Sequence, residues 1–256
     1  MKSAQYLEER QQNILALIRR SGRATVSELS RAFGVSEVTI RADLQSLAQR
    51  QLIVRTHGGA LAMGYTPELS LALRREQQPA AKARIGAAAA ALVNDGEAIF
   101  LDASSTVLAI AAHLKEHHEL TVITNSLAVA QLLLDAPGIT VVMPGGFMQR
   151  ETASLIGLEG LELLNKFNIQ KGFFGAQGLS LPEGLSDASI ADAEIKRQMV
   201  KLCRQVIVVL DSTKWQRVGL ASYARLTDIH CVITDKQAPA TLVRRVRAAG
   251  VKVILA

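Results

Sequence analysis

Seven short apolar runs recur in the chain after residue 80, and segments with helical spacing separate most of them. The runs cover residues 98–101, 120–123, 139–143, 171–175, 205–210, 229–233 and 251–255. The helical segments include residues 81–93, 106–115, 126–135, 190–203 and 239–248. Strands that alternate with helices in this way predict βαβ units, which build a parallel sheet. We therefore predict an α/β domain over residues 80–256, with an open, mostly parallel, doubly wound sheet.

Polar residues follow these predicted strands at the points where the strands end. They are Asp102 with Ser104, Ser105 and Thr106, then Thr124, Asn125 and Ser126, then Gly145 and Gly146, then residues 175–178, then residues 211–214, and finally Thr234 and Asp235. Each segment alone is also compatible with an ordinary helix cap or turn. Because the carboxyl ends of parallel strands meet at one edge of a sheet, where such sheets bind ligands, six polar ends together favour a binding site.

The residue types at these strand ends indicate a small phosphorylated ligand. Residues 104–106 open a helix directly after a strand, so their hydroxyls and free backbone N–H groups suit an anion. Lys214 offers a positive partner, and Asp102 and Asn125 suit sugar hydroxyls. The chain has neither a G-x-G-x-x-G motif nor a Walker-type lysine, which argues against a nucleotide. We expect a phosphorylated sugar or polyol as the ligand.

The first 60 residues have a different pattern. We expect helices at about residues 6–20, at about 27–33 and from Ser36 onward. Their apolar residues at helical spacing would form a small core, and include Ile14, Leu17, Ile18, Leu29, Phe33, Ile40, Leu44 and Leu47. Either Ser27 or Thr25 caps the second helix, and Gly34 allows a sharp turn before the third. This pattern is typical of a helix-turn-helix domain.

The third helix and the segment after it carry the candidate DNA contacts. Opposite its apolar stripe, the helix presents hydrogen-bonding residues that would enter a major groove. The β-like segment "LIVRTHGGA" then alternates and turns at Gly58-Gly59, as a wing does, which places two basic residues beside the phosphates or in a minor groove. The predicted contacts are Ser36, Glu37, Thr39, Arg41, Gln45, Arg55 and His57.

The charge distribution agrees with a DNA-binding module. Residues 1–60 hold nine lysine and arginine residues against five acidic ones, so most of the net charge of +6 lies in under a quarter of the chain. A basic face is often only a solvated one, but here it coincides with the helix-turn-helix pattern.

The segments "VSEVTIRADL", residues 35–44, and "THGGA", residues 56–60, resemble the signature of DeoR-type bacterial transcriptional regulators, V-S-x-x-T-I-R-R-D-L followed by H-G-G-A. Ala42 departs from the motif, where the family often has Arg, Asn or Lys, and leaves room for a methyl contact to thymine. Asp43 is expected to orient or neutralise a neighbouring arginine, because DNA would repel it. The resemblance implies a winged helix-turn-helix domain and a repressor of a carbohydrate-utilisation operon.

The resemblance extends to the second domain, which is similar to the effector domain of this family and, through it, to ribose-5-phosphate isomerase. In the family, motifs of the form D-x-G-T-T, T-N-S, G-G and D-S-S-K line the sugar-phosphate pocket. They correspond here to residues 102–106, 124–126, 145–146 and 211–214, so the resemblance adds Gly145 and Gly146 to the candidate ligand site. Ser104 stands where the family usually has Gly, which adds a side chain to the phosphate loop.

A sugar-phosphate isomerase-like enzyme is the alternative reading of the second domain. The isomerase has an acid-rich loop where this chain has "GAQGLS", residues 175–180, and Glu194 is isolated on a predicted helix. A binding protein without DNA activity is disfavoured by the recognition helix and the wing. His113 and His117 have the spacing for zinc but lack further clustered ligands. We therefore predict no catalytic residue, no metal site and no cofactor.

We expect a cytoplasmic homo-oligomer, a dimer or a tetramer, that binds double-stranded operator DNA. Symmetric dimers let repressors read paired half-sites. The longest apolar run, residues 85–93, is far too short to span a membrane, and Cys203 and Cys231 fit reduced core thiols. Residues 1–60 are expected to form the DNA-binding domain, residues 61–79 a linker, and residues 80–256 the effector domain.

Overall fold

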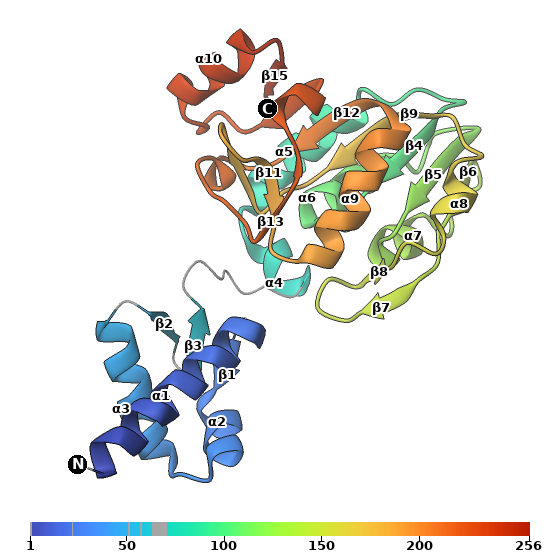
Figure 1. Ribbon diagram of the computed structural model, residues 1–256. Coiled ribbons are helices and arrows are strands. Elements are labelled where there is room, and N and C mark those ends of the chain that lie inside the picture. Colours follow the sequence, from blue (N-terminus) through green and yellow to red (C-terminus); the bar gives the residue numbers. More distant parts are fainter. Residues whose placement is uncertain (1, 22, 51, 57, 63–70) are drawn as a thin grey trace. The chain divides into compact units, whose positions relative to one another are not determined.

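The computed structural model describes residues 2–21, 23–50, 52–56, 58–62 and 71–256 (Figure 1). The chain divides into two compact units, Met1–Pro67 and Glu68–Ala256. Among the described helices, none is both long enough and apolar enough to cross a membrane.

Three helices and a small antiparallel sheet make up the described part of the first unit. The helices are α1 (Lys2–Ser21), α2 (Val26–Phe33) and α3 (Glu37–Gln49). The strands β1 (Arg23–Thr25), β2 (Ile53–Thr56) and β3 (Gly59–Ala62) lie in the order β1-β3-β2. One apolar cluster holds the helices together, with Ile14, Ile18, Leu29, Ile40, Leu44 and Leu47 buried in it. The helix-turn-helix arrangement and the wing are therefore confirmed.

Local hydrogen bonds fix the ends of α2 and α3. Of the two candidate caps for α2, the structure selects Thr25, whose hydroxyl accepts from the backbone N–H of Glu28 at 3.1 Å, while the Glu28 carboxylate accepts from the N–H of Thr25 at 2.8 Å. Gly34 ends α2 with a φ of 63°, which suits glycine. Ser36 then caps α3 by accepting from the N–H of Thr39 at 3.2 Å.

The wing differs in one detail from the sequence-based expectation. Gly58 lies in the turn as expected, but Gly59 belongs to β3 and pairs with Thr56. A Cβ atom at Gly59 would lie 2.2 Å from the carbonyl oxygen of Ala24, so the glycine serves the close approach of β3 to β1. His57 lies outside the described residues.

The second unit is built on a seven-stranded sheet in the order β15-β14-β12-β9-β4-β5-β6. All neighbouring pairs in it are parallel. The strands are β4 (Ala98–Leu101), β5 (Leu120–Thr124), β6 (Ile139–Val142), β9 (Ile169–Phe174), β12 (Cys203–Val209), β14 (Cys231–Thr234) and β15 (Lys252–Leu255). Each of the seven predicted strands is confirmed.

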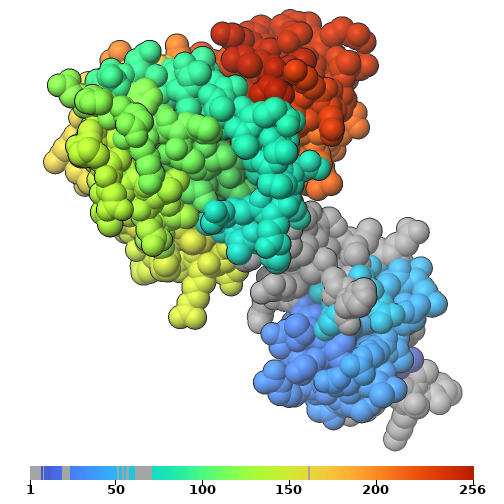
Figure 2. Space-filling model, turned by 180° about the vertical axis from the view of Figure 1, so that it is seen from behind, coloured from blue at the N-terminus to red at the C-terminus, as the bar shows by residue number. Residues whose placement is uncertain are grey.

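Helices cover both faces of this sheet, as a doubly wound fold requires (Figure 1). One face carries α5 (Pro79–Ala90), α6 (Ser105–Ala111) and α7 (Leu127–Leu133), and Figure 2 shows the unit from this side, coloured teal to green. The other face carries α8 (Leu161–Leu164), α9 (Ile190–Leu202) and α10 (Ala240–Ala248). Alternate strand residues supply the two cores, so Ile99 and Leu101 face one layer and Phe100 the other.

Smaller elements surround the main sheet. β10 (Gly178–Ser180), β11 (Gly184–Asp187) and β13 (Ala221–Ala224) form an antiparallel sheet, and β7 (Phe147–Gln149) pairs with β8 (Ser154–Ile156). Two 3-10 turns, η1 (Ser212–Lys214) and η2 (Leu226–Asp228), lie in loops. α4 (Leu71–Glu76) lies within residues 61–79 and packs in the second unit, where the N–H of Leu71 donates to the carbonyl of Glu151 at 2.9 Å.

Candidate functional site

The first unit presents a polar surface on α3 and β2. Glu37, Arg41 and Gln45 are exposed on α3, and Arg41 forms an ion pair with Glu37 at 2.6 Å. Arg55 of β2 donates a hydrogen bond to the side chain of Gln45, so the wing and the third helix share one surface. The structure thus brings these predicted residues together, with Ser36 and Thr39 at the start of the helix.

Asp43 lies on the opposite side of α3 and serves the scaffold. Its side chain is buried and accepts from Arg10 Nε at 2.6 Å and from Gln11 Nε2 at 3.2 Å. Both partners lie on α1, so this network fixes the orientation of α3 within the unit. The expectation that Asp43 engages an arginine is confirmed.

In the second unit, loops after three adjacent strands enclose a small polar pocket. Residues 104–106 follow β4, residues 175–177 follow β9, and Lys214 follows β12. Because β4 and β9 are neighbours while the chain continues from β4 to β5, the pocket lies where the strand order reverses, the usual ligand site of such sheets. The lining residues are Arg74, Gln77, Lys82, Ser104, Ser105, Thr106, Gly175, Ala176, Gln177, Asp187, Lys196, Leu210 and Lys214.

Lys196 is buried at the base of this pocket, and carboxylates compensate its charge. Its Nζ lies 2.6 Å from Asp187 Oδ2 and 2.9 Å from Asp102 Oδ2, and it donates to the Gly175 carbonyl at 2.9 Å. Burial lowers the pKa of Lys196, but the charges of Asp102 and Asp187 together raise it well above its ordinary value. Lys196 therefore remains charged and joins α9 to the loops after β4 and β9.

The other cations that line the pocket, Arg74, Lys82 and Lys214, form no ion pair in the described part of the chain, and Asp211 compensates the charges of Lys82 and Lys214 only in part. Burial lowers the pKa of Lys82 to about 8, with Lys214 and Arg74 acting in the same direction against Asp211. Burial also lowers the pKa of Lys214. In the part of the chain that the structure describes, Nε and Nη2 of Arg74 are buried and have no hydrogen-bond partner. Buried donors and unpaired positive charge make the pocket suited to an anion.

The loop after β4 is held in place by backbone and side-chain hydrogen bonds. Asp102 Oδ1 accepts from the N–H of Ser104 at 2.8 Å, and its Oδ2 accepts from the N–H of Gly175 at 2.7 Å. Ser104 caps α6 by accepting from the N–H of Val107 at 3.2 Å. Ser105 and Thr106 border the pocket directly after this cap. Ser105 and Thr106 therefore line the same pocket as Arg74, Lys82 and Lys214.

The remaining predicted ligand residues lie outside the lining of this pocket. Asp102 is 1% exposed and is occupied by the contacts above. Asn125 is buried and donates to the Leu155 carbonyl at 3.1 Å, while its Oδ1 has no hydrogen-bond partner among the described residues. Gly145 and Gly146 are exposed in the loop after β6, with φ angles of 84° and 118°. β6 is an edge strand, so its end is far along the sheet from β9 and β12.

Sequence reasoning missed four charged pocket residues, Arg74, Lys82, Asp187 and Lys196. Arg74 and Lys82 precede the first strand of the sheet and reach the pocket only through tertiary packing. A signal existed for Lys196 and Lys82, because each interrupts an apolar stripe on a helix whose neighbouring positions are buried.

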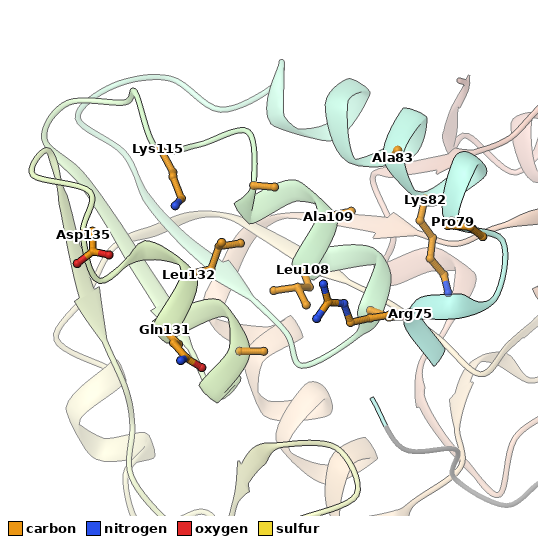
Figure 3. A pocket seen from close by; sticks show the side chains of 13 residues that line it. Arg75, Pro79, Lys82, Ala83, Leu108, Ala109, Lys115, Gln131, Leu132 and Asp135 are labelled. Atoms are coloured by element: carbon orange, nitrogen blue, oxygen red, sulfur yellow. The ribbon is translucent and has the colours of Figure 1, made fainter. Parts of the chain in front are cut away.

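A larger groove of about 510 Å³ adjoins this pocket between α5, α6 and α7 (Figure 3). Lys82 and Ser105 line both cavities. In Figure 3, Arg75 extends beside Leu108, and Lys115 extends toward the groove from above Leu132. Leucine and alanine side chains line the floor of this groove, and both basic and acidic side chains, among them Lys115 and Asp135, lie at its edge.

Two side chains of a kind that could serve catalysis or zinc binding, Glu194 and His117, have partners within the fold. Glu194 is half-buried, pairs with Arg197 and accepts from Gln198 at 2.9 Å. His117 Nδ1 forms a hydrogen bond with Asp95 Oδ1 at 2.6 Å. No group of three or more His, Cys, Asp or Glu side chains that could hold a metal ion occurs among the described residues.

Comparison with known proteins identifies similarity over both units. Residues 10–64 match the DeoR-like helix-turn-helix domain, and residues 77–236 match the DeoR C terminal sensor domain. The chain is 33% identical over 250 residues to a putative aga operon transcriptional repressor of Escherichia coli O157:H7, covering 96% of this chain and 93% of that protein. It is 28% identical over 236 residues to the glycerol-3-phosphate regulon repressor of Escherichia coli K12, covering 92% and 94%.

Among solved structures, ribose 5-phosphate isomerase A from Methanocaldococcus jannaschii is similar in fold. The match has a TM-score of 0.40 and 18% sequence identity, and it covers 53% of this chain and 54% of the isomerase.

Proposed function

The chain belongs to the DeoR family of transcriptional regulators, and from that premise we propose that it represses a carbohydrate-utilisation operon until a phosphorylated sugar binds. Two relatives named as repressors support the sign of regulation, and the regulon of one is named for a phosphorylated polyol. The observation that carries the ligand class is the pocket that Arg74, Lys82 and Lys214 line together with Ser105 and Thr106.

In the proposed complex, α3 lies in the major groove and reads bases with Thr39, Arg41 and Gln45. Arginine bidentate to guanine and glutamine bidentate to adenine are the usual pairings for such side chains. The Arg41–Glu37 ion pair is exposed and therefore weak, so DNA can replace it without a large loss. Arg55, beside Gln45, extends the contact to the backbone or to a neighbouring minor groove.

In the second unit we propose that the phosphate binds between residues 104–106 and the cations Arg74, Lys82 and Lys214. Charge-assisted hydrogen bonds to phosphate are short and strong, and Arg74 has two buried donors available for them. Asn125 Oδ1 is the candidate acceptor for a sugar hydroxyl. Asp102 acts through the loop that it holds, because its oxygens already accept from Ser104 and Gly175.

We propose that this pocket senses its ligand and does not transform it. Aldose–ketose isomerisation needs a carboxylate free to act as a base. Asp187 lines the pocket, but Lys196 and the N–H of Ala188 engage its oxygens, and Glu194 is bound by Arg197 and Gln198. The curated relatives compared above are named as regulators, which supports the same conclusion.

The DNA-binding half is tested on an operator selected from a pool of random-sequence duplexes with the full chain. Arg41→Ala and Arg55→Ala should each weaken binding by about 1–3 kcal/mol in gel-shift titrations if the residue contacts a base. Arg50→Ala, at the exposed end of α3, is the matched control and should change affinity less. Unchanged affinity in both Arg41→Ala and Arg55→Ala would show that the recognition surface is assigned wrongly.

The ligand half is tested by adding phosphorylated sugars to the same operator complex. A typical coupling between effector binding and DNA binding lowers operator affinity roughly 5- to 150-fold. Lys214→Ala should abolish this response and leave ligand-free DNA binding intact, whereas Arg217→Ala removes an exposed charge three residues away and should respond normally. An uncharged sugar acting as the effector, or a normal response in Lys214→Ala, would contradict the proposed phosphate site.

A further inference from the structure

Helix α4 is the first described element after β3, and hydrogen bonds at Leu71 and Arg74 help to attach it to the second unit. The buried Leu71 donates its N–H to the Glu151 carbonyl at 2.9 Å. At the other end of the helix, Lys82 Nζ donates to the carbonyl of Arg74. α4 is a single short helix, and so it depends on such contacts for its position.

The Arg74 side chain extends from α4 into the lining of the polar pocket. Its Nε and Nη2 are buried without a hydrogen-bond partner in the described part of the chain. The positive charges of Lys82 and Lys214 repel one another and this guanidinium, and the Asp211 carboxylate offsets part of this repulsion. An empty pocket therefore destabilises the position of α4 on the second unit, because it leaves buried donors unsatisfied and places like charges together.

The junction between α4 and α5 is also strained. Gln78 has a φ of 52° and a ψ of 44°, although it carries a side chain and directly precedes Pro79. A residue before proline is normally extended, and a non-glycine residue in this left-handed region is uncommon. Gln77, the preceding residue, borders the pocket. Rotation at Gln78 would relax the strain and withdraw Gln77 and Arg74 from the pocket together.

We propose that Arg74 makes α4 a ligand-dependent latch, which phosphate closes by accepting hydrogen bonds from Nε and Nη2. This inference rests on the proposed phosphate site and adds the element through which that site acts. The bound anion satisfies the donors, offsets the repulsion and holds α4 on the second unit. α4 is the first described element of the second unit. Its attachment therefore fixes the place on the second unit at which the chain arrives from the DNA-binding unit.

Hydrogen exchange of the full-length chain, with inorganic phosphate as the probe, tests the latch. If α4 opens only in the unbound state, exchange across residues 71–78 slows by a factor of 1 + [L]/Kd, which is roughly 100-fold at a phosphate concentration about 100 times Kd. Arg74→Met keeps a long side chain without donors and should lose this protection. Arg84→Met changes an exposed arginine on α5 that lines neither this pocket nor the adjoining groove, and should behave like the wild type.

A thermal-shift titration with phosphate on the same samples shows whether the phosphate site or only the α4 latch is wrong. Phosphate that stabilises the wild type but leaves exchange in residues 71–78 unchanged overturns the latch while the phosphate site stands. Full protection of these residues in Arg74→Met overturns it as well. If phosphate neither stabilises the wild type nor alters its exchange, both the site and the latch are wrong. Slower exchange in the wild type and in Arg84→Met, lost in Arg74→Met, is the result that supports the latch.

Discussion

Gly175 connects the loops of the pocket through its backbone. Its N–H donates to Asp102 at 2.7 Å, and its carbonyl accepts from Lys196 at 2.9 Å and from the Tyr223 hydroxyl at 2.8 Å. These bonds require a close approach to Ser104. A Cβ atom at position 175 would lie 2.3 Å from Ser104 Oγ and 2.4 Å from Ser104 Cβ.

The first prediction follows from this contact. Gly175→Ala should lower the free energy of unfolding by about 1–3 kcal/mol, the usual cost of overpacking. Ser104→Gly removes the atoms that collide and, as a helix cap, costs only a few tenths of a kcal/mol. The double variant should therefore recover most of the loss. Urea denaturation of the two single variants and the double variant measures this coupling, and additive effects would show that the strain is relieved elsewhere.

The second prediction concerns Lys82. Burial lowers its pKa to about 8, so the side chain is charged below that pH and becomes neutral above it in the ligand-free protein. A phosphate monoester, whose second pKa is about 6, remains a dianion over this range. Affinity for the monoester should fall as the pH rises through about 8, because the attraction to the Lys82 charge is lost.

Lys82→Arg provides the control for this pH dependence. Arginine keeps its charge at all these pH values, so the variant should retain more of its affinity at pH 9 relative to pH 7 than the wild type. Isothermal titration at both pH values measures the ratio. In the absence of ligand the lowered pKa has the opposite consequence, since stability should rise as the pH increases from about 8 toward the ordinary lysine value of 10.5. Equal ratios in the two proteins would show that Lys82 does not meet the phosphate.

At the level of elements, the main sheet was predictable because its strands are buried on both faces. Runs such as "VIVV" before Leu210 are apolar throughout and need no partner to be recognised. The sheet of β10, β11 and β13 was not predictable. Its strands contain glycine and serine, and β11 pairs with β13 across more than thirty residues of chain. Such pairing depends on packing against α9, which no local pattern encodes.

The residues of the candidate site likewise include some that the sequence predicts and others that it does not. Residues 104–106 and Lys214 come directly after strands, and the topology of a parallel sheet is sufficient to bring them together. Arg74 and Lys82 come from helices whose positions are set by tertiary contacts, such as the one between Leu71 and Glu151. The amino-acid sequence alone also presents all strand ends as equivalent. It could not distinguish the edge position of β6, which places Gly145 and Gly146 outside the pocket lining.

For the whole molecule, the DNA-binding unit sets a limit on specificity. The exposed half of α3 is short, and so one copy can read only a few base pairs. Residues 1–60 carry most of the excess positive charge, which strengthens binding to any DNA and makes it sensitive to salt. A second copy of the chain, arranged by symmetry, doubles the number of bases read, because it repeats the same set of contacts on a second half-site.

The last prediction is therefore that the chain is a homo-oligomer, a dimer or a tetramer, that binds paired half-sites. Light scattering of the full chain should give a mass that is a multiple of the monomer mass, with and without DNA. Operators selected from random duplexes should contain an inverted repeat whose half-sites lie about 34–36 Å apart, or a multiple of that distance. Moving one half-site by about five base pairs places it on the opposite face of the duplex and should weaken binding far more than moving it by a full turn. A stable monomer both free and on DNA, or selected operators with a single half-site, would refute this arrangement.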